Sequence, residues 1–131
     1  MIVELDDASP VPPYEQIRAQ VAAMIGSGAL PPGTRLPPIR QLAGDLGLAV
    51  NTVARAYREL EAGGLVASRV RTGTVVAERT PRELDDRTAA DARRLLVEAV
   101  RSFAATTRRL GIADHEALAA VVAELGGEGK G

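Results

Sequence analysis

Arginine side chains cluster in the middle of the sequence, between residues 35 and 71. This stretch holds six arginines and three acidic residues, a local charge of +3 in a chain whose formal net charge is −1. A guanidinium group presents a planar fork of N–H donors that fits a phosphate or the edge of guanine. Binding DNA requires a cationic face rather than a cationic protein, so these side chains are candidates for DNA contacts. They are Arg35, Arg40, Arg55, Arg58, Arg69 and Arg71.

Three consecutive residues inside this basic stretch have side chains suited to base edges. Asn51 can form two hydrogen bonds with adenine, Thr52 can contact a thymine methyl group or a phosphate, and Val50 can make only apolar contacts. They stand where a helical pattern begins, and the first turns of a recognition helix are the part that reaches base edges. The structural alternative for Asn51 and Thr52 is that they cap the helix.

The arginines also have an alternative, since charged side chains are ordinary on solvated surfaces. Arg55 and Arg58 could form exposed ion pairs with Glu59 or Glu61, and Arg35 could pair with a nearby acid. Arg58 is expected to face the DNA backbone or solvent, so it is not among the predicted contacts.

The flanking sequence predicts the elements that would position these residues. Two short helices separated by a turn at Gly47 indicate a helix-turn-helix, and the hairpin that follows, with its basic connection, is typical of a wing. Thr34–Leu36 is expected to form a very short strand. The helices are predicted at residues 13–27, 37–46 and 50–62, and the strands of the wing at 65–68 and 74–77, joined by 69–73.

The rest of the chain predicts only helices. Thr80-Pro81 breaks the pattern, residues 84–110 form one long amphipathic helix, and Asp114 is expected to cap a last helix before a frayed tail at 126–131. A small winged domain cannot cover the apolar face of the long helix, so we expect it to pair with a second copy. The predicted fold class is α+β, with a winged helix-turn-helix domain at residues 1–79 and a two-helix dimerisation region at 80–131.

Several classes of function find no support in the sequence. There is no phosphate-binding loop, metal-ligand cluster or nucleophile motif, and His115, the only histidine, stands between two acids at a predicted helix start. We therefore expect no enzyme activity, no cofactor and no metal. The N-terminus lacks the features of a signal peptide, no apolar run is long enough for a membrane span, and cysteine is absent, so a cytoplasmic protein without a membrane partner is expected.

The aromatic residues are few, namely Tyr14, Tyr57 and Phe103. All three lie on apolar stripes of predicted helices, and we expect them to pack in cores. The wing contains no aromatic residue, which argues against stacking on single-stranded nucleic acid.

Four motifs in the first part of the chain occur in a familiar order and spacing. They are Pro13–Ile17 (PYEQI), Leu30–Pro37 (LPPGTRLP), Arg40–Ala43 (RQLA) and Asn51–Leu60 (NTVARAYREL). In these motifs the chain resembles the GntR family of bacterial regulators from about Pro12 to Val76. The short helical remainder resembles the family's smallest architecture, the YtrA subfamily.

This resemblance implies a bacterial repressor that binds double-stranded operator DNA, an inverted repeat, as a homodimer. It also implies control of its own operon, which often encodes an ABC transporter. The sequence departs from the family at two positions, Ala49, where a capping residue is common, and Val70, where the wing often has glycine. These departures leave open a winged-helix interaction module without sequence-specific DNA binding, and a small-molecule effector is left open as well. The residues expected at the DNA are Arg35, Arg40, Val50, Asn51, Thr52, Arg55, Arg69 and Arg71.

Overall fold

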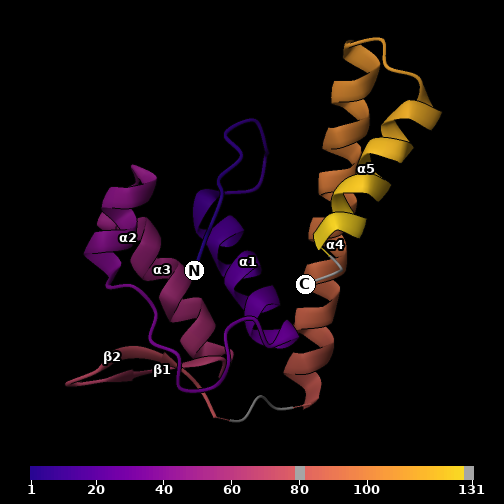
Figure 1. Cartoon of the computed structure of the whole chain (residues 1–131). Coiled ribbons are helices and arrows are strands. Elements are labelled where there is room, and N and C mark those ends of the chain that lie inside the picture. The colour runs from indigo at the N-terminus through magenta and orange to yellow at the C-terminus, as the bar shows by residue number, and fades with distance from the viewer. Residues whose placement is uncertain (79–81, 129–131) are drawn as a thin grey trace. The chain divides into compact units, whose positions relative to one another are not determined.

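The computed structural model describes residues 1–78 and 82–128. Its described part contains five α-helices and a two-stranded antiparallel sheet, so the predicted α+β class is confirmed (Figure 1). The chain divides into two compact units, Met1–Leu95 and the residues from Leu96 onward. The elements are α1 (Pro13–Ser27), α2 (Ile39–Leu46), α3 (Val50–Ala62), β1 (Val66–Arg69), β2 (Gly73–Val76), α4 (Arg82–Arg109) and α5 (Asp114–Glu128).

The core of the first unit lies between α1 and α3. Ile17 and Val21 of α1 are completely buried, as is Val53 of α3, and Leu60 is 1% exposed. The buried positions recur at helical spacing along each helix, as the sequence pattern predicted. Each large aliphatic side chain that is fully buried contributes about 1.5–3 kcal/mol, so this shared core holds α3 firmly against α1 and fixes which of its faces stays exposed.

A tight turn joins α2 to α3. α2 ends at Gly47, whose φ of 67° lies in the left-handed region that glycine adopts without steric cost. The N–H of Leu48 then donates to the carbonyl of Ala43 at 2.9 Å. α2 begins at Ile39 rather than at the predicted residue 37, because Pro38 keeps an extended conformation (ψ 146°) as the residue before the helix.

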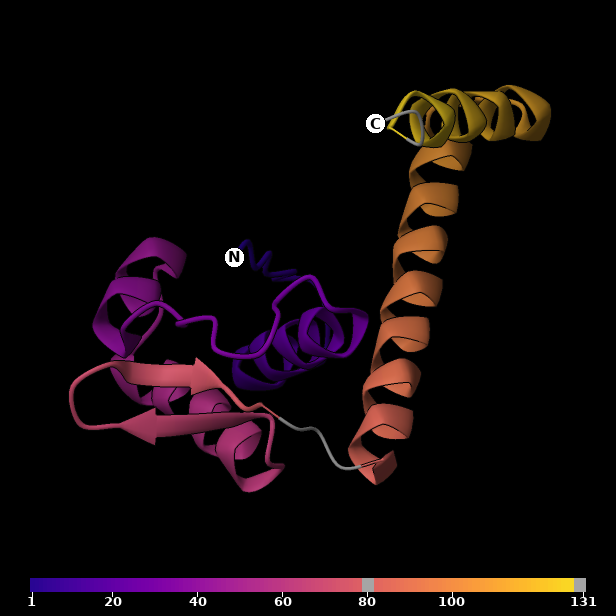
Figure 2. The same cartoon turned by 60° about the horizontal axis from the view of Figure 1, so that its bottom comes forward.

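The wing is the hairpin of β1 and β2 (Figure 2), one residue shorter at its open end than predicted. Leu65 instead closes the turn after α3, since its N–H donates to the carbonyl of Leu60. Residues 70–72 form the connection, and Gly73 supplies the positive φ of 75° that such a loop needs. Val70 therefore occupies the wing tip without backbone strain. The predicted short strand at 34–36 is reduced to a single bridge, Arg35 to Val75.

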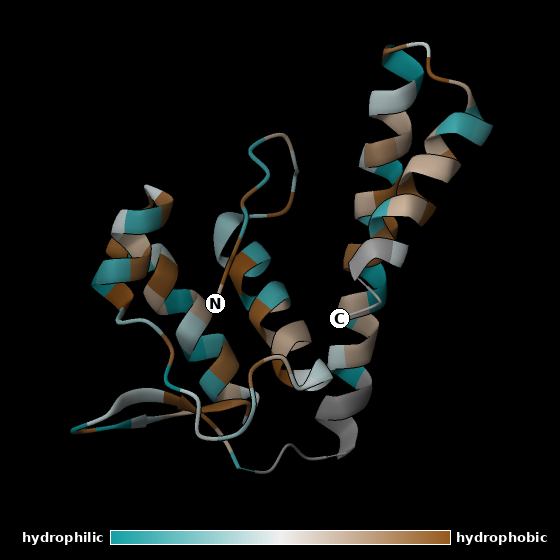
Figure 3. Cartoon of the chain, viewed as in Figure 1, coloured by the Kyte–Doolittle hydropathy of each residue, from teal (hydrophilic) through white to brown (hydrophobic). Residues whose placement is uncertain are grey.

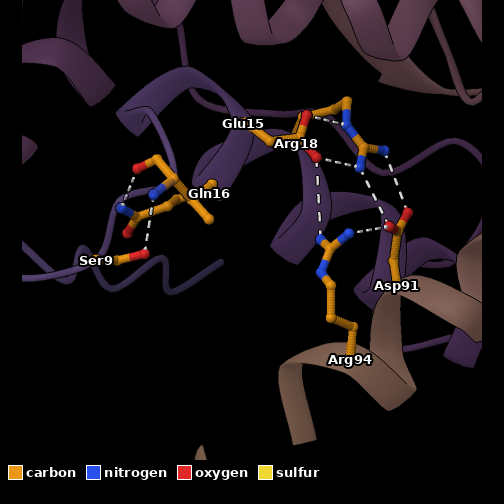
Figure 4. A network of polar contacts seen from close by, with 7 residues as sticks. Ser9, Glu15, Gln16, Arg18, Asp91 and Arg94 are labelled. Carbon is orange, nitrogen blue, oxygen red and sulfur yellow. Dashed lines mark hydrogen bonds and ion pairs between the residues drawn. The ribbon is translucent and has the colours of Figure 1, made fainter. Parts of the chain in front are cut away.

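The first turns of α4 are tied to α1 by a buried ionic network (Figure 4). The Arg18 guanidinium donates to both oxygens of Asp91 at 3.2 Å and to both oxygens of Glu15 at 2.6 Å. Arg94 adds contacts to Asp91 and Glu15 at 3.5 and 3.9 Å. The helices also approach closely at Gly26, where an added Cβ would lie 2.4 Å from Oγ1 of the buried Thr88.

The second unit consists of the later turns of α4, a turn at Gly111, and α5, which reverses the direction of the chain. Asp114 is the first residue of α5 rather than its cap, and the helix continues to Glu128, so the predicted fraying from residue 126 is wrong for 126–128. The predicted helix break at Thr80-Pro81 and the last three residues lie outside the described residues.

Hydrophobic residues recur along the later turns of α4 and along α5 (Figure 3). Many of their side chains are exposed in the single chain. Phe103 is 41% exposed, so the predicted core position for this residue is wrong for one isolated chain. None of the described helices is both long and apolar enough to cross a membrane. The exposed large hydrophobic residues of this unit are Leu96, Val97, Val100, Phe103, Leu110, Leu118, Val122 and Leu125.

The boundary between the two compact units falls within α4, at residues 95 and 96. The division into a DNA-binding domain at residues 1–79 and a dimerisation region at 80–131 stays a prediction.

Candidate nucleic-acid interface

The first turn of α3 presents its side chains to solvent. Val50 is 46% exposed, Asn51 is exposed and Thr52 is partly exposed. The residue before the helix is Ala49, which makes no side-chain capping bond. Asn51 and Thr52 are the second and third residues of the helix, so the capping alternative is wrong for both. The positive end of the α3 dipole is therefore left without a side-chain partner, an arrangement that favours an approaching anion.

Arg55 lies one turn after Asn51 and therefore on the same side of α3. Its guanidinium carbon is 3.7 Å from the centroid of the Tyr14 ring, which comes from the first turn of α1. Among the described residues, neither Arg55 nor Arg58 forms an ion pair, so the predicted alternative pairing with Glu59 or Glu61 does not occur there. Glu61 instead accepts a hydrogen bond from the backbone N–H of Ser68.

Arg35 and Arg40 border the same hollow, which has a volume of about 340 Å³ and lies between the tip end of β2 and the start of α2. Both arginines are exposed. Gly73 and Thr74 of β2 line the other side, and an added Cβ on Gly73 would lie 3.7 Å from Nε of Arg35. No acidic side chain of the described residues lines this hollow, so the two guanidinium groups give it a positive rim.

A buried tyrosine supports the segment that carries these two arginines. The hydroxyl of Tyr57, on α3, donates to the carbonyl of Pro37 at 2.7 Å. Tyr57 is 4% exposed, as its predicted core role requires, and this burial raises its pKa to about 12. The bond links α3 to the residues just before α2.

Arg69 and Arg71 stand on either side of the wing tip, and both are exposed. Val70 between them is fully exposed. The predicted DNA-contacting residues thus come from three parts of the first unit, namely α2 with the segment before it, the first turns of α3, and the wing. Sequence reasoning missed the residues that hold these arginines in position, above all Tyr14, whose ring lies under Arg55. Within the described ranges no cluster of His, Cys, Asp or Glu could hold a metal ion.

Comparison with known proteins relates this chain to a family of bacterial regulators. The family model described as bacterial regulatory proteins, gntR family, matches residues 13–76, from the start of α1 to the end of β2. The HTH-type transcriptional regulator Rv1152 of Mycobacterium tuberculosis is 39% identical over 116 residues, which is 88% of each chain. The HTH-type transcriptional repressor YtrA of Bacillus subtilis is 36% identical over 77 residues, 59% of each chain.

Among solved structures, YtrA from Sulfolobus acidocaldarius, a GntR-family transcription factor, matches 77% of this chain and 99% of its own. Its TM-score is 0.58 and its identity to this chain is 32%. This chain belongs to the GntR family. The AraR DNA-binding domain in complex with its operator ORX1 also matches, with a TM-score of 0.51 and 25% identity over 59% of this chain and 95% of its own. The GntR-family chain is therefore a YtrA-like transcription regulator with a DNA-binding winged helix, and its relatives are regulators rather than enzymes.

Proposed function

We propose that this GntR-family regulator is a homodimeric repressor that binds an inverted-repeat operator and controls its own operon. The observation that carries the proposal is the exposed, uncapped start of α3, flanked by exposed arginines of α2 and the wing that form no ion pair with the described residues. Each of these parts offers hydrogen-bond donors or positive charge to DNA, and the described residues that line the hollow between α2 and the wing include no acid.

In this proposal the first turns of α3 enter the major groove. Asn51 and Thr52 read base edges there, and Val50 makes apolar contacts. Arg40 and Arg35 hold the phosphates beside the groove, since a guanidinium fork matches phosphate geometry. Arg69 and Arg71 reach the adjacent backbone or minor groove.

The exposed apolar side chains of the second unit support a homodimer. On α4, Leu96, Val100, Phe103 and Leu110 recur at spacings of four, three and seven residues, which places them on one stripe, and α5 adds three further exposed residues. Exposed apolar residues scattered singly are ordinary, whereas several of them on one stripe of a helix indicate a surface that binds a partner. A second copy that brings the same face would cover it in a two-fold arrangement.

Repression follows physically from occupation of a promoter by the dimer, and the relative YtrA of Bacillus subtilis is itself a repressor. We propose that the controlled operon is the protein's own and that it encodes an ABC transporter. The protein would then act in the cytoplasm, where the operator is, and a small-molecule effector that releases the operator fits the same scheme.

Two substitutions test the proposed DNA surface, Asn51→Ala and Arg40→Ala, with the exposed Arg93→Ala on α4 as the matched control. A base contact of this kind contributes about 1–3 kcal/mol, so Asn51→Ala should weaken operator binding by roughly 5- to 150-fold. Arg40→Ala should weaken operator and unrelated duplexes alike and reduce the salt dependence. Undiminished affinity in both variants would refute the proposed surface.

Sedimentation tests the dimer. The wild-type chain should sediment as a dimer at micromolar concentration, and Val100→Asp should shift it to the monomer by placing a charge in the apolar face. The control is Arg101→Gln, which changes the charge at the next position. Arg101 is not part of the apolar stripe, so this variant should stay a dimer. A monomeric wild type would contradict the dimer.

A further inference from the structure

The Tyr14–Arg55 contact joins the first turn of α1 to the reading face of α3. The ring of Tyr14 lies 3.7 Å below the guanidinium carbon of Arg55. No other interaction of the Arg55 side chain occurs in the part of the chain that the structure describes. The ring is therefore what limits the directions in which this exposed arginine can extend.

Tyr14 is itself held in place. It is partly buried and packs against the core of the first unit. The residues before it are bound to α1 by Gln16, whose side-chain amide donates to the carbonyls of Asp6 and Val11 and accepts from the N–H of Asp6. Packing against the core thus restricts the directions that the Tyr14 ring can take.

A stack of this kind uses only the flat face of the guanidinium group. The N–H donors point outward around its edge and stay free for a base or a phosphate. An arginine that is already confined loses less conformational freedom when it binds than one that moves freely in solvent. Arg55 also lies one helical turn from Asn51, so its edge is available on the side of α3 that carries the candidate base contact.

We propose that Tyr14 is a positioning residue that orients Arg55 for operator recognition. The inference rests on the proposed function and adds an indirect specificity role for Tyr14, exerted through its contact with Arg55. Immobilisation of one such side chain corresponds to about a 2- to 12-fold change in affinity at each half-site.

The test compares Tyr14→Phe, Tyr14→Leu and Tyr14→Met in the full-length chain. The probe is the duplex that the wild-type protein selects from a random pool, and a scrambled duplex is the reference. Tyr14→Phe keeps the ring and should keep wild-type affinity and selectivity. The leucine and methionine variants fill the same partly buried position without a π face, and each should bind the selected duplex more weakly, with a smaller loss on the scrambled one.

A second arm uses Arg55→Ala, which should weaken binding to the selected duplex by itself. In the Arg55→Ala background, Tyr14→Leu should cause no further loss, because the ring then has nothing to orient. Circular dichroism at the assay temperature verifies that each variant is folded, and if one aliphatic variant unfolds the other supplies the comparison.

Three results would overturn the positioning role while leaving the proposed function intact. They are wild-type selectivity in a folded aliphatic variant, an equal further loss from Tyr14→Leu in the Arg55→Ala background, and undiminished binding by Arg55→Ala alone. A wild-type chain that selects no duplex at all would refute the proposed function and the positioning role together.

Discussion

Replacing Asp91 by asparagine removes one charge from the network that ties the start of α4 to α1 (Figure 4). The side chains of Arg18 and Asp91 are only 10% and 7% exposed, so water cannot replace the lost partner. Asparagine keeps the shape of aspartate, but its amide group turns a donor toward the Arg18 guanidinium. The substitution therefore isolates the ionic contribution from the packing of the helix.

The expected loss of unfolding free energy depends on the ionic partner that Arg18 retains in the variant. Removing one partner from a buried ion pair costs about 3–5 kcal/mol when the other charge is left alone. Here Arg18 retains two contacts of 2.6 Å with Glu15, so its charge stays compensated. We expect the free energy of unfolding to fall by about 2–3 kcal/mol, which for a unit of this size lowers Tm by roughly 10–20 °C.

Urea unfolding followed by far-ultraviolet circular dichroism measures this loss. The control is Asp7→Asn, an exposed acid in the N-terminal segment, which should change the free energy of unfolding by less than about 0.5 kcal/mol. In a double-mutant cycle, Arg18→Met with Asp91→Asn should cost less than the sum of the two single changes. A loss from Asp91→Asn no greater than that of the control would refute the argument that the buried network holds these helices together.

Three further predictions concern single residues of the first unit. Hydrogen bonds from Arg18 hold the pKa of Glu15 below its usual value of 4.5, so the stability that it contributes above that pH is lost as the pH falls through the folded pKa. Unfolding measured from pH 6 to 3 should therefore show a steeper decline for the wild type than for Glu15→Gln, and parallel curves would contradict this. Gly26→Ala should lower the free energy of unfolding by about 1–3 kcal/mol through its collision with Thr88, whereas Gly44→Ala, which faces open space, should raise it by up to about 1 kcal/mol. Thermal melts of the two variants measure these changes. Equal changes in stability for Gly26→Ala and Gly44→Ala would contradict the close approach of Thr88 to Gly26. Tyr57→Phe should cost about 1 kcal/mol by removing a buried hydroxyl bond, and the wild type should lose stability as the pH rises from 10 toward 12, a loss that Tyr57→Phe should lack.

Local patterns were enough to predict most elements of the winged unit. The apolar stripes of α1 and α3 predicted these two helices because burial of one face is what stabilises each helix. Gly47 marked the turn between α2 and α3, since a left-handed residue is needed there. Val70 stands where the family often has glycine, which put the wing-tip conformation in doubt. The loop instead takes its positive φ at Gly73, three residues later, and this position depends on the register of the two strands.

Contacts between residues far apart in the chain could not be predicted in this way. Arg18 and Asp91 are separated by 73 positions, and each is an ordinary polar residue on its own helix. Tyr14 stood on an apolar stripe, and the pattern alone favoured a core role over a platform for Arg55. The apolar stripe of α4 did indicate a surface that needs a partner, and this face remains exposed in the single chain.

The central claim is that α2, α3 and the wing together bind operator DNA, and the salt dependence of binding tests it most directly. The protein should shift the duplex upstream of its own gene far below the concentration needed for a scrambled duplex. If four to eight phosphates are neutralised by the arginines of a dimer, the logarithm of the binding constant should fall with the logarithm of salt concentration with a slope of about −4 to −7. Equal binding to both duplexes, or an affinity that does not change between 50 and 200 mM salt, would contradict the account.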